Sequence, residues 1–293
     1  MKILVTGANG FLGQHLTIYL AGKGYHIAAC SRGICRITTP CLFEYYAIDL
    51  TDERSVLSLI GKVQPDVVIH TAAMSKPDEC NTHKTACLLQ NVETVKFLLQ
   101  ACKPLQTHFI YISTDFIFGE NGPHSEDEVP APMNFYGESK LLAENLVVSS
   151  GLRYAIVRPV FIYGPVLEGM RPSFLHWIKN NLEQHKFIKV VSDQQRTPTL
   201  VTDICKGIEV IVTQKQEGAF HLAGKDIISP FQMAVAVASF LKLDAALIEN
   251  VTSDTFIETV QRAKHSGLKI DKARKILGYE PVSFEEGVQL TFN

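Results

Sequence analysis

The stretch MKILVTGANGFLG (residues 1–13) decides the fold of this 293-residue chain. Ile3-Leu4-Val5 is a short apolar run, as expected for a strand that is buried on both faces. Gly7, Gly10 and Gly13 follow it at intervals of three residues. Such glycines let the chain leave the strand, approach a pyrophosphate closely and pack the next helix on the sheet. The stretch therefore predicts the turn of a dinucleotide-binding domain rather than an ordinary glycine-rich turn.

Apolar strands and helical segments alternate after this turn. Further strands are predicted at residues 25–30, 43–48, 66–70, 108–112 and 154–157. Strands that alternate with helices are typical of an α/β fold with a doubly wound parallel (Rossmann) sheet. A helix over residues 201–212 and a strand over 218–222 are expected to return to this sheet.

The alternation fades after Gly164-Pro165, which predicts a second lobe. We expect residues 1–164 and 199–226 to form the dinucleotide-binding domain. Residues 165–198 and 227–293 are expected to form a smaller, mainly helical C-terminal lobe that binds the substrate.

Composition excludes several classes of function. The formal charge of −2 gives no electrostatic reason to bind nucleic acid. No apolar stretch reaches the roughly 20 residues of a membrane helix, and the N-terminus does not resemble a signal peptide. Seven cysteines at irregular spacing indicate reduced thiols and predict a cytoplasmic protein.

One group of side chains has the residue types of a metal site. Cys80, His83 and Cys87 would share a helix face, but a metal would require a fourth ligand and supporting hydrogen bonds. The sequence offers neither, so we expect no metal.

The ligand of a doubly wound sheet lies beyond the carboxyl ends of its strands. After the second strand, a protein that prefers NAD usually has an acidic residue for the ribose hydroxyl, whereas this chain has Ser31-Arg32. These side chains suit a 2′-phosphate, so NADP (as NADPH) is the predicted cofactor and NAD the alternative. The alternative interpretation of Arg32 is a solvated loop residue with no role in binding. The predicted cofactor-binding residues are Gly7, Asn9, Gly10, Phe11, Leu12, Gly13, Ser31, Arg32, Asp49, Leu50, Thr71, Ala72, Ala73, Tyr136 and Lys140.

Tyr136 and Lys140 are four residues apart on a predicted helix and so share a face. A nearby ammonium should lower the pKa of the phenol, which then can give its proton to a carbonyl oxygen that receives hydride. Thr114, at the end of the fifth strand, can hydrogen-bond the same oxygen. A second pair with this spacing, Tyr19 and Lys23, has no such hydroxyl partner. The alternative is that Tyr136 is only a core residue and Lys140 a surface residue.

These features resemble the extended short-chain dehydrogenase/reductases. Asn91 matches the asparagine that completes the proton relay of that family, which makes Thr114, Tyr136, Lys140 and Asn91 the predicted catalytic residues. Over nearly the whole chain, several motifs resemble the dTDP-4-dehydrorhamnose reductase branch. They are Ser113-Thr114-Asp115-Phe116-Ile117-Phe118, Tyr136-Gly137-Glu138-Ser139-Lys140-Leu141, Pro198-Thr199, residues 218–224 and Ser266-Gly267-Leu268.

The resemblance implies reduction of the 4-keto group of a nucleotide-linked 6-deoxysugar, as in dTDP-rhamnose biosynthesis, by a protein that can form a homodimer. The branch usually has Trp in place of Phe161 and Gly in place of Arg196. Arg196 is placed like an arginine that holds the substrate diphosphate in related epimerases, and Arg262 or Lys264 would be a second clamp, unless these are solvated cations. The predicted substrate-binding residues are Ser113, Thr114, Asp115, Phe161, Arg196 and Arg262.

Other functions are compatible with parts of this pattern. A dehydratase of this fold would have the sequence Thr-Asp-Glu at this position. Here Phe116 follows Asp115 instead. A nucleotide-sugar 4-epimerase uses the same Thr, Tyr and Lys but usually has an acid after the second strand. A non-catalytic NADP-binding regulatory protein has no need of Thr114, Tyr136 and Lys140 together, and no Gly-x-Ser-x-Gly elbow indicates a hydrolase.

Overall fold

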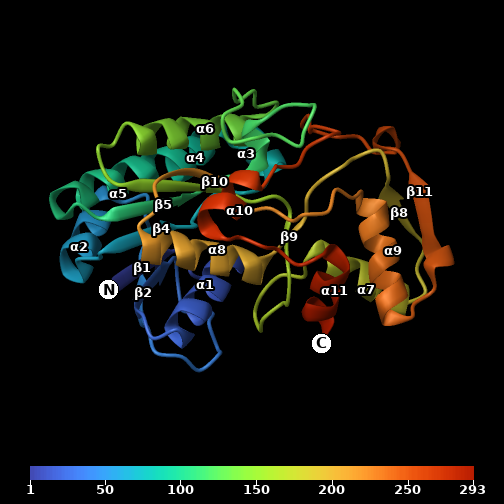
Figure 1. Cartoon of the computed structure of the whole chain (residues 1–293), viewed down its shortest axis with the longest axis horizontal. Coiled ribbons are helices and arrows are strands. Elements are labelled where there is room, and N and C mark those ends of the chain that lie inside the picture. Colours follow the sequence, from blue (N-terminus) through green and yellow to red (C-terminus); the bar gives the residue numbers. More distant parts are fainter.

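A computed structural model, which describes residues 1–293, has a seven-stranded parallel sheet at its centre (Figure 1). The strand order is β10-β6-β5-β4-β1-β2-β3. This order confirms the predicted doubly wound sheet and the return of the 218–222 segment, which pairs with β6. The strands are β1 (Lys2–Thr6), β2 (His26–Ser31), β3 (Glu44–Ala47), β4 (Val67–His70), β5 (His108–Ile112), β6 (Tyr154–Arg158) and β10 (Gly218–His221).

Both faces of the sheet are covered by helices because the side chains of each strand alternate between two apolar cores. In β5, Phe109 and Tyr111 join one core and Ile110 and Ile112 join the other. Figure 1 shows α5 and α6 above the sheet and α1 and α8 below it. The covering helices are α1 (Phe11–Gly22), α2 (Glu53–Val63), α5 (Thr94–Cys102), α6 (Phe135–Val148), α8 (Val201–Gln214) and α10 (Asp271–Leu277).

The chain before α5 is divided into several short helical segments. Two short helices, α3 (Pro77–Thr82) and α4 (Lys84–Leu88), come first, and a π-helical turn, η1 (Leu89–Glu93), joins them to α5. A π turn holds one extra residue per turn and often marks a functional site. Here it places the side chain of Asn91 in the interior, with none of it exposed.

A second lobe, at the right of Figure 1, has its own apolar core. Its helices are α7 (Phe174–Glu183), α9 (Pro230–Leu241) and α11 (Phe284–Phe292). Two parallel strand pairs, β8 (Ile188–Val191) with β11 (Ile248–Val251) and β7 (Ile162–Tyr163) with β9 (Thr199–Leu200), were not predicted. Strands this short carry little periodicity. Short 3₁₀ turns are η2 (Lys103–Leu105), η3 (Asp115–Ile117), η4 (Ala245–Leu247) and η5 (Ser253–Thr255).

Candidate active site

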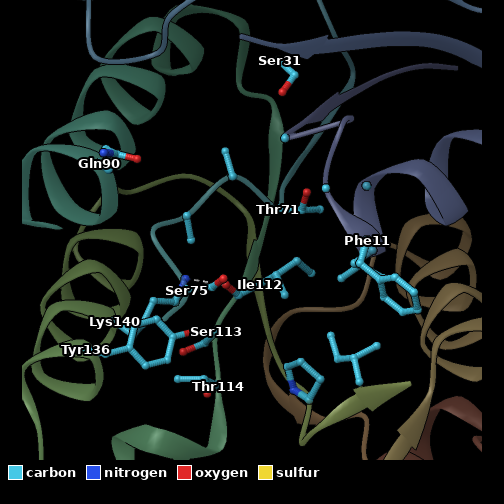
Figure 2. A pocket seen from close by; sticks show the side chains of 18 of the residues that line it. Phe11, Ser31, Thr71, Ser75, Gln90, Ile112, Ser113, Thr114, Tyr136 and Lys140 are labelled. Carbon is cyan, nitrogen blue, oxygen red and sulfur yellow. Dashed lines mark hydrogen bonds between the residues drawn. The ribbon is translucent and has the colours of Figure 1, made fainter. Parts of the chain in front are cut away.

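A cavity of about 700 Å³ opens at the carboxyl edge of the sheet, where β1 lies between β2 and β4. Strand order reverses here, so the loops that follow neighbouring strands run to opposite faces and leave a crevice. The glycine turn, the ends of β2, β4 and β5, helix α6 and residues 159–174 all contribute to its wall. Figure 2 shows side chains from these elements converging on one space.

The glycine turn forms part of the cavity wall, and its packing leaves no room for a Cβ at Gly7 or Gly13. Gly7 has a φ of +68°, and a Cβ there would lie 2.6 Å from the backbone nitrogen of Ala72. A Cβ on Gly13 would lie 2.2 Å from the carbonyl oxygen of Gly7. The start of α1 therefore lies directly against the turn, and its first residues, whose backbone N–H groups have no partner within the helix, line the cavity.

The ends of β2 and β3 form the far side of the cavity from α6. Ser31, Arg32, Asp49 and Leu50 line it, as do Phe11 and Leu12 at the start of α1. Asn9 does not line the cavity. Its Nδ2 donates to the carbonyl oxygen of Ile34 at 2.8 Å and its Oδ1 accepts from the backbone nitrogen of Arg36 at 2.9 Å. Asn9 thus fixes the loop that carries Arg32, and direct contact with a cofactor stays a prediction.

The segment after β4 lies against the glycine turn. Thr71, Ala72 and Ala73 line the cavity, and the Thr71 hydroxyl donates to the carbonyl oxygen of Thr6 at 2.7 Å. Small side chains here keep the cavity open between the turn and α6.

Tyr136 and Lys140 lie one turn apart on α6 and both line the cavity, beside Thr114 at the end of β5 (Figure 2). Lys140 Nζ donates to the carbonyl oxygen of Ile112 at 2.7 Å and lies 4.1 Å from the centre of the Tyr111 ring. Burial lowers the pKa of Lys140 to about 7. The Thr114 hydroxyl donates to Asp115 at 3.2 Å and accepts from the backbone nitrogen of Phe116 at 3.2 Å.

The sequence-based expectation for the Tyr136 phenol was wrong in direction. Burial raises the pKa of Tyr136 above its ordinary value, and a hydrogen bond with Thr114 opposes this shift only in part. Desolvation exceeds the expected effect of the ammonium because both groups lie in the interior. The phenol therefore keeps its proton near neutral pH, as a proton donor must.

Asn91 is buried beside α6 and does not line the cavity. Its Oδ1 accepts from the backbone nitrogen of Met74 at 2.8 Å, and its Nδ2 donates to the carbonyl oxygen of Met74 and to Ser139 Oγ, each at 3.0 Å. Ser139 Oγ donates to the carbonyl oxygen of Tyr136 at 2.7 Å. Asn91 thus ties the wall after β4 to α6, and its part in a proton relay stays a prediction.

Cys80 and Cys87 pack beside Tyr136 in a small buried cluster. His83 lies at the break between α3 and α4 and is exposed. The structure contains no group of three or more His, Cys, Asp or Glu side chains that could hold a metal ion.

The predicted substrate residues fall into two groups. Ser113, Thr114, Asp115 and Phe161 line the cavity, whereas Arg196 and Arg262 do not. Arg196 donates to Ser266 Oγ at 3.1 Å and to Gln194 Oε1 at 2.8 Å. Arg262 pairs with Asp78 at 2.6 Å and Glu258 at 3.6 Å, and Lys264 pairs with Asp193 at 3.0 Å. A phosphate clamp from these cations stays a prediction that requires them to exchange partners.

The sequence analysis missed several lining residues. Gln90 and Ser75 face the cavity (Figure 2). Arg171, which is exposed, lines it just before α7, where Ser173 caps the helix. The Arg-Pro-Ser sequence before an apolar helix was the available signal for this helix start. The remaining lining residues that were missed are Ile48, Thr51, Thr94, Ile112, Phe116, Pro159, Ile162, Tyr163, Pro172 and Phe174.

The chain is similar to proteins of known family and structure. A family model described as the RmlD substrate binding domain matches residues 1–293. The chain belongs to this family. The chain is also similar to dTDP-4-dehydrorhamnose reductase of Bacillus anthracis, solved in complex with NADP. That structure matches with a TM-score of 0.87 and 25% identity, over 99% of this chain and 98% of the other.

Two further relatives have names that state a different function from that of the reductase. UDP-glucuronic acid 4-epimerase of Bacillus cereus, solved with UDP-glucuronic acid and NAD, matches with a TM-score of 0.85 and 26% identity over 99% of this chain and 97% of the other. Methionine adenosyltransferase 2 subunit beta of Mus musculus is 28% identical over 98% of this chain and 86% of the relative. The chain thus resembles a reductase and an epimerase of sugar nucleotides and also a subunit of a methionine adenosyltransferase. None of the helices combines the length and the apolar composition that a membrane span requires.

Proposed function

We propose that this protein is an NADPH-dependent reductase of the 4-keto group of a nucleotide-linked 6-deoxysugar. The observation that carries the proposal is the meeting of Tyr136, Lys140 and Thr114 with the glycine turn in one cavity. The family and the likeness to the NADP complex from Bacillus anthracis support it.

The residues present fit a dinucleotide. Gly7 and Gly13 leave a wall that any Cβ would fill, and the first N–H groups of α1 suit a pyrophosphate. Ser31 and Arg32 line the cavity and would hold the 2′-phosphate, which favours NADP, with NAD as the weaker alternative. When bound, the nicotinamide supplies a hydride to the carbonyl carbon.

The protein's own residues would manage the carbonyl oxygen. Tyr136 would donate its phenolic proton to that oxygen as general acid, since burial keeps the phenol protonated. Thr114 would hydrogen-bond and place the same oxygen, in competition with Asp115 for the hydroxyl proton. Lys140, fixed by the carbonyl of Ile112, would orient the cofactor and, in its protonated form, stabilise the phenolate that forms.

Arg171 is our candidate for the substrate's diphosphate. The charged side chains that line the cavity are Arg32, Asp49, Asp115, Lys140 and Arg171. Arg32 and Asp49 follow β2 and β3, and Lys140 is bound to a backbone carbonyl. Arg171 is therefore the remaining cation, and it has the geometry that suits phosphate oxygens.

The test is oxidation of NADPH by the purified protein with dTDP-4-dehydrorhamnose, followed by absorbance. If Arg171→Ala raises KM for the sugar nucleotide and leaves kcat unchanged, the result would support the diphosphate role. A protein that binds NADPH but reduces no 4-keto nucleotide sugar would contradict the reductase assignment.

A second candidate function rests on the match to methionine adenosyltransferase 2 subunit beta. In this alternative, the chain binds NADP and regulates a partner enzyme. Two results would favour this alternative. The chain would copurify with a methionine adenosyltransferase, and it would change the rate of that enzyme equally well with or without Tyr136→Phe.

A third possibility, a nucleotide-sugar 4-epimerase, would be indicated by NAD that stays bound through purification.

A further inference from the structure

Cys80 and Cys87 are two buried thiols that the proposed reaction does not use. Neither side chain is exposed, and both belong to the small apolar cluster that contains Tyr136. Along one continuous helix these two positions would lie about 10 Å apart. The helix is broken at His83, where φ is −120° and ψ is 58°, so α3 and α4 pack against each other and bring the two thiols together.

Polar groups surround the sulfur of Cys87. Asn91 Nδ2 donates to it at 3.4 Å, and as a thiol it donates to Ser139 Oγ at 3.4 Å. A hydrogen bond from Cys80, helped by those of Ser139 and Asn91 and by the charge of Lys140, lowers the pKa of Cys87 to about 7. The thiolate is the reactive form of cysteine, so Cys87 is suited to attack an oxidant.

Cys80 is placed to react second. Its thiol donates to the carbonyl oxygen of Met74 at 3.3 Å, and its hydrogen bond with Cys87 raises the pKa of Cys80 above the ordinary value. Cys87 therefore ionises first while Cys80 keeps its proton. A low-pKa thiol next to a second thiol is the arrangement of many cysteine pairs that respond to oxidants.

Access to the two sulfurs depends on α3 and α4. These helices have six and five residues, which is too short for a helix to be stable on its own. The chain at residues 81–85, where the two helices meet, is exposed. Such segments open locally at a small cost in free energy, so a small oxidant can reach the thiols.

The pair is connected to the helix that carries the proposed acid. Ser139 Oγ accepts from Cys87 and from Asn91, and it donates to the carbonyl oxygen of Tyr136 at 2.7 Å. A covalent bond between the sulfurs is shorter than a contact between two thiols, so α3 and α4 would have to move relative to α6. A shift of about 1 Å at a reacting group can lower a rate by about 10²-fold.

We propose that hydrogen peroxide converts Cys80 and Cys87 into a reversible disulfide, and that this modification slows the reaction in the cavity by displacing Tyr136. The bond itself does not depend on the proposed function, whereas its effect on turnover does.

The oxidation proceeds in two steps. The Cys87 thiolate attacks one oxygen of the peroxide. The S–O bond forms, the O–O bond breaks, and the departing hydroxide takes up the proton that Cys87 had lost. Cys80 then attacks the sulfur of this sulfenic acid. The S–S bond forms, the S–O bond breaks, and the second hydroxide takes the proton of Cys80. The two thiols lose two electrons and two protons, and the peroxide is reduced to two molecules of water.

The first test is peptide mapping of the full chain after treatment with a few equivalents of hydrogen peroxide. Trypsin cleaves after Lys84, so Cys80 lies in the peptide 63–84 and Cys87 in the peptide 85–96. We expect mass spectrometry without reductant to find these two peptides joined, and dithiothreitol to separate them. Oxidised protein in which the two peptides are not joined would overturn the proposal.

The second test assigns the loss of activity to the pair. In a chain with Cys35→Ser and Cys41→Ser, which lacks the two half-exposed thiols, peroxide should lower the rate of NADPH oxidation at least about tenfold, and dithiothreitol should restore it. Adding Cys87→Ser should remove this sensitivity. Adding Cys102→Ser, which replaces a buried thiol outside the cluster, should leave it unchanged. Equal sensitivity of these last two proteins, each relative to its own untreated rate, would contradict the role of the pair.

The proposed function and this modification fail in different ways. Joined peptides with an unchanged rate of NADPH oxidation would overturn the switch and leave the proposed reaction intact. Joined peptides in a protein that reduces no sugar nucleotide would contradict only the proposed reaction. In that case NADPH titration tests the switch, because Tyr136 lines the cavity, and equal affinity of the oxidised and reduced proteins would overturn it.

Discussion

Replacing Gly13 by alanine tests the contact between the glycine turn and α1. The new Cβ would lie 2.2 Å from the carbonyl oxygen of Gly7, 2.8 Å from its carbonyl carbon and 2.9 Å from the Cα of Ala8. Ordinary contacts of a Cβ begin at 3.4 Å, so turn and helix must separate by about 1.2 Å. All three atoms belong to the backbone, so no side chain can rotate away. Overpacking of this kind costs about 1–3 kcal/mol.

The cost should appear in both stability and NADPH affinity, because the displaced groups are those that would hold the pyrophosphate. We expect urea unfolding to show a loss of about 1–3 kcal/mol and NADPH fluorescence titration to show binding about tenfold weaker or worse. Gly22→Ala is the matched control, since a Cβ at the end of the same helix meets nothing within 4 Å. If Gly13→Ala bound NADPH as tightly as Gly22→Ala, the turn could not be the pyrophosphate site.

Three other predictions concern single side chains. Arg32→Ala should weaken NADPH by about tenfold or more and NADH little, because charge-assisted bonds contribute about 1.5–3 kcal/mol; equal losses in titrations with both cofactors would exclude the 2′-phosphate role. Between pH 7 and 10.5 the unfolded chain carries a proton on Lys140 that the folded chain lacks, so this residue makes stability rise with pH. Lys140→Met should flatten that rise in urea unfolding, and an unchanged slope would contradict the low pKa. Asn91→Ala should cost about 1–3 kcal/mol in the same assay because it leaves the backbone groups of Met74 unpaired. A loss as small as that of Asn181→Ala, at a half-buried surface position, would argue against this role.

Periodicity was sufficient to predict the sheet. Most strands of the sheet are short, apolar and separated by helices, so consecutive apolar residues such as Ile3-Leu4-Val5 indicate their burial on both faces. The π turn at Leu89–Glu93 could not be predicted in this way. Its hydrogen-bond pattern differs from that of an α-helix, but the residues that form it are ordinary helix residues. The β8–β11 pair joins segments about 60 residues apart that carry no shared pattern.

Some features of the candidate site could be predicted from the sequence and others could not, for a physical reason. Glycines and the Tyr136–Lys140 spacing report on local backbone geometry, and the structure places these residues around one cavity. Arg196 and Arg262 depend on distant partners instead, such as Ser266 and Asp78, so their sequence positions alone could not show that their guanidinium groups are already bound to other side chains. The direction of the Tyr136 pKa shift likewise depends on burial, which the helix spacing does not reveal.

The most direct measurement is the rate of hydride transfer in a single turnover, with protein in excess over dTDP-4-dehydrorhamnose and NADPH saturating. Tyr136→Phe should retain NADPH affinity but transfer hydride about 10²–10⁴ times more slowly, since it lacks the acid. Tyr19→Phe, from the second pair with this spacing, loses only a hydrogen bond to Glu209 and should react at the normal rate. Equal rates for Tyr136→Phe and Tyr19→Phe would contradict the assignment of Tyr136 as the proton donor.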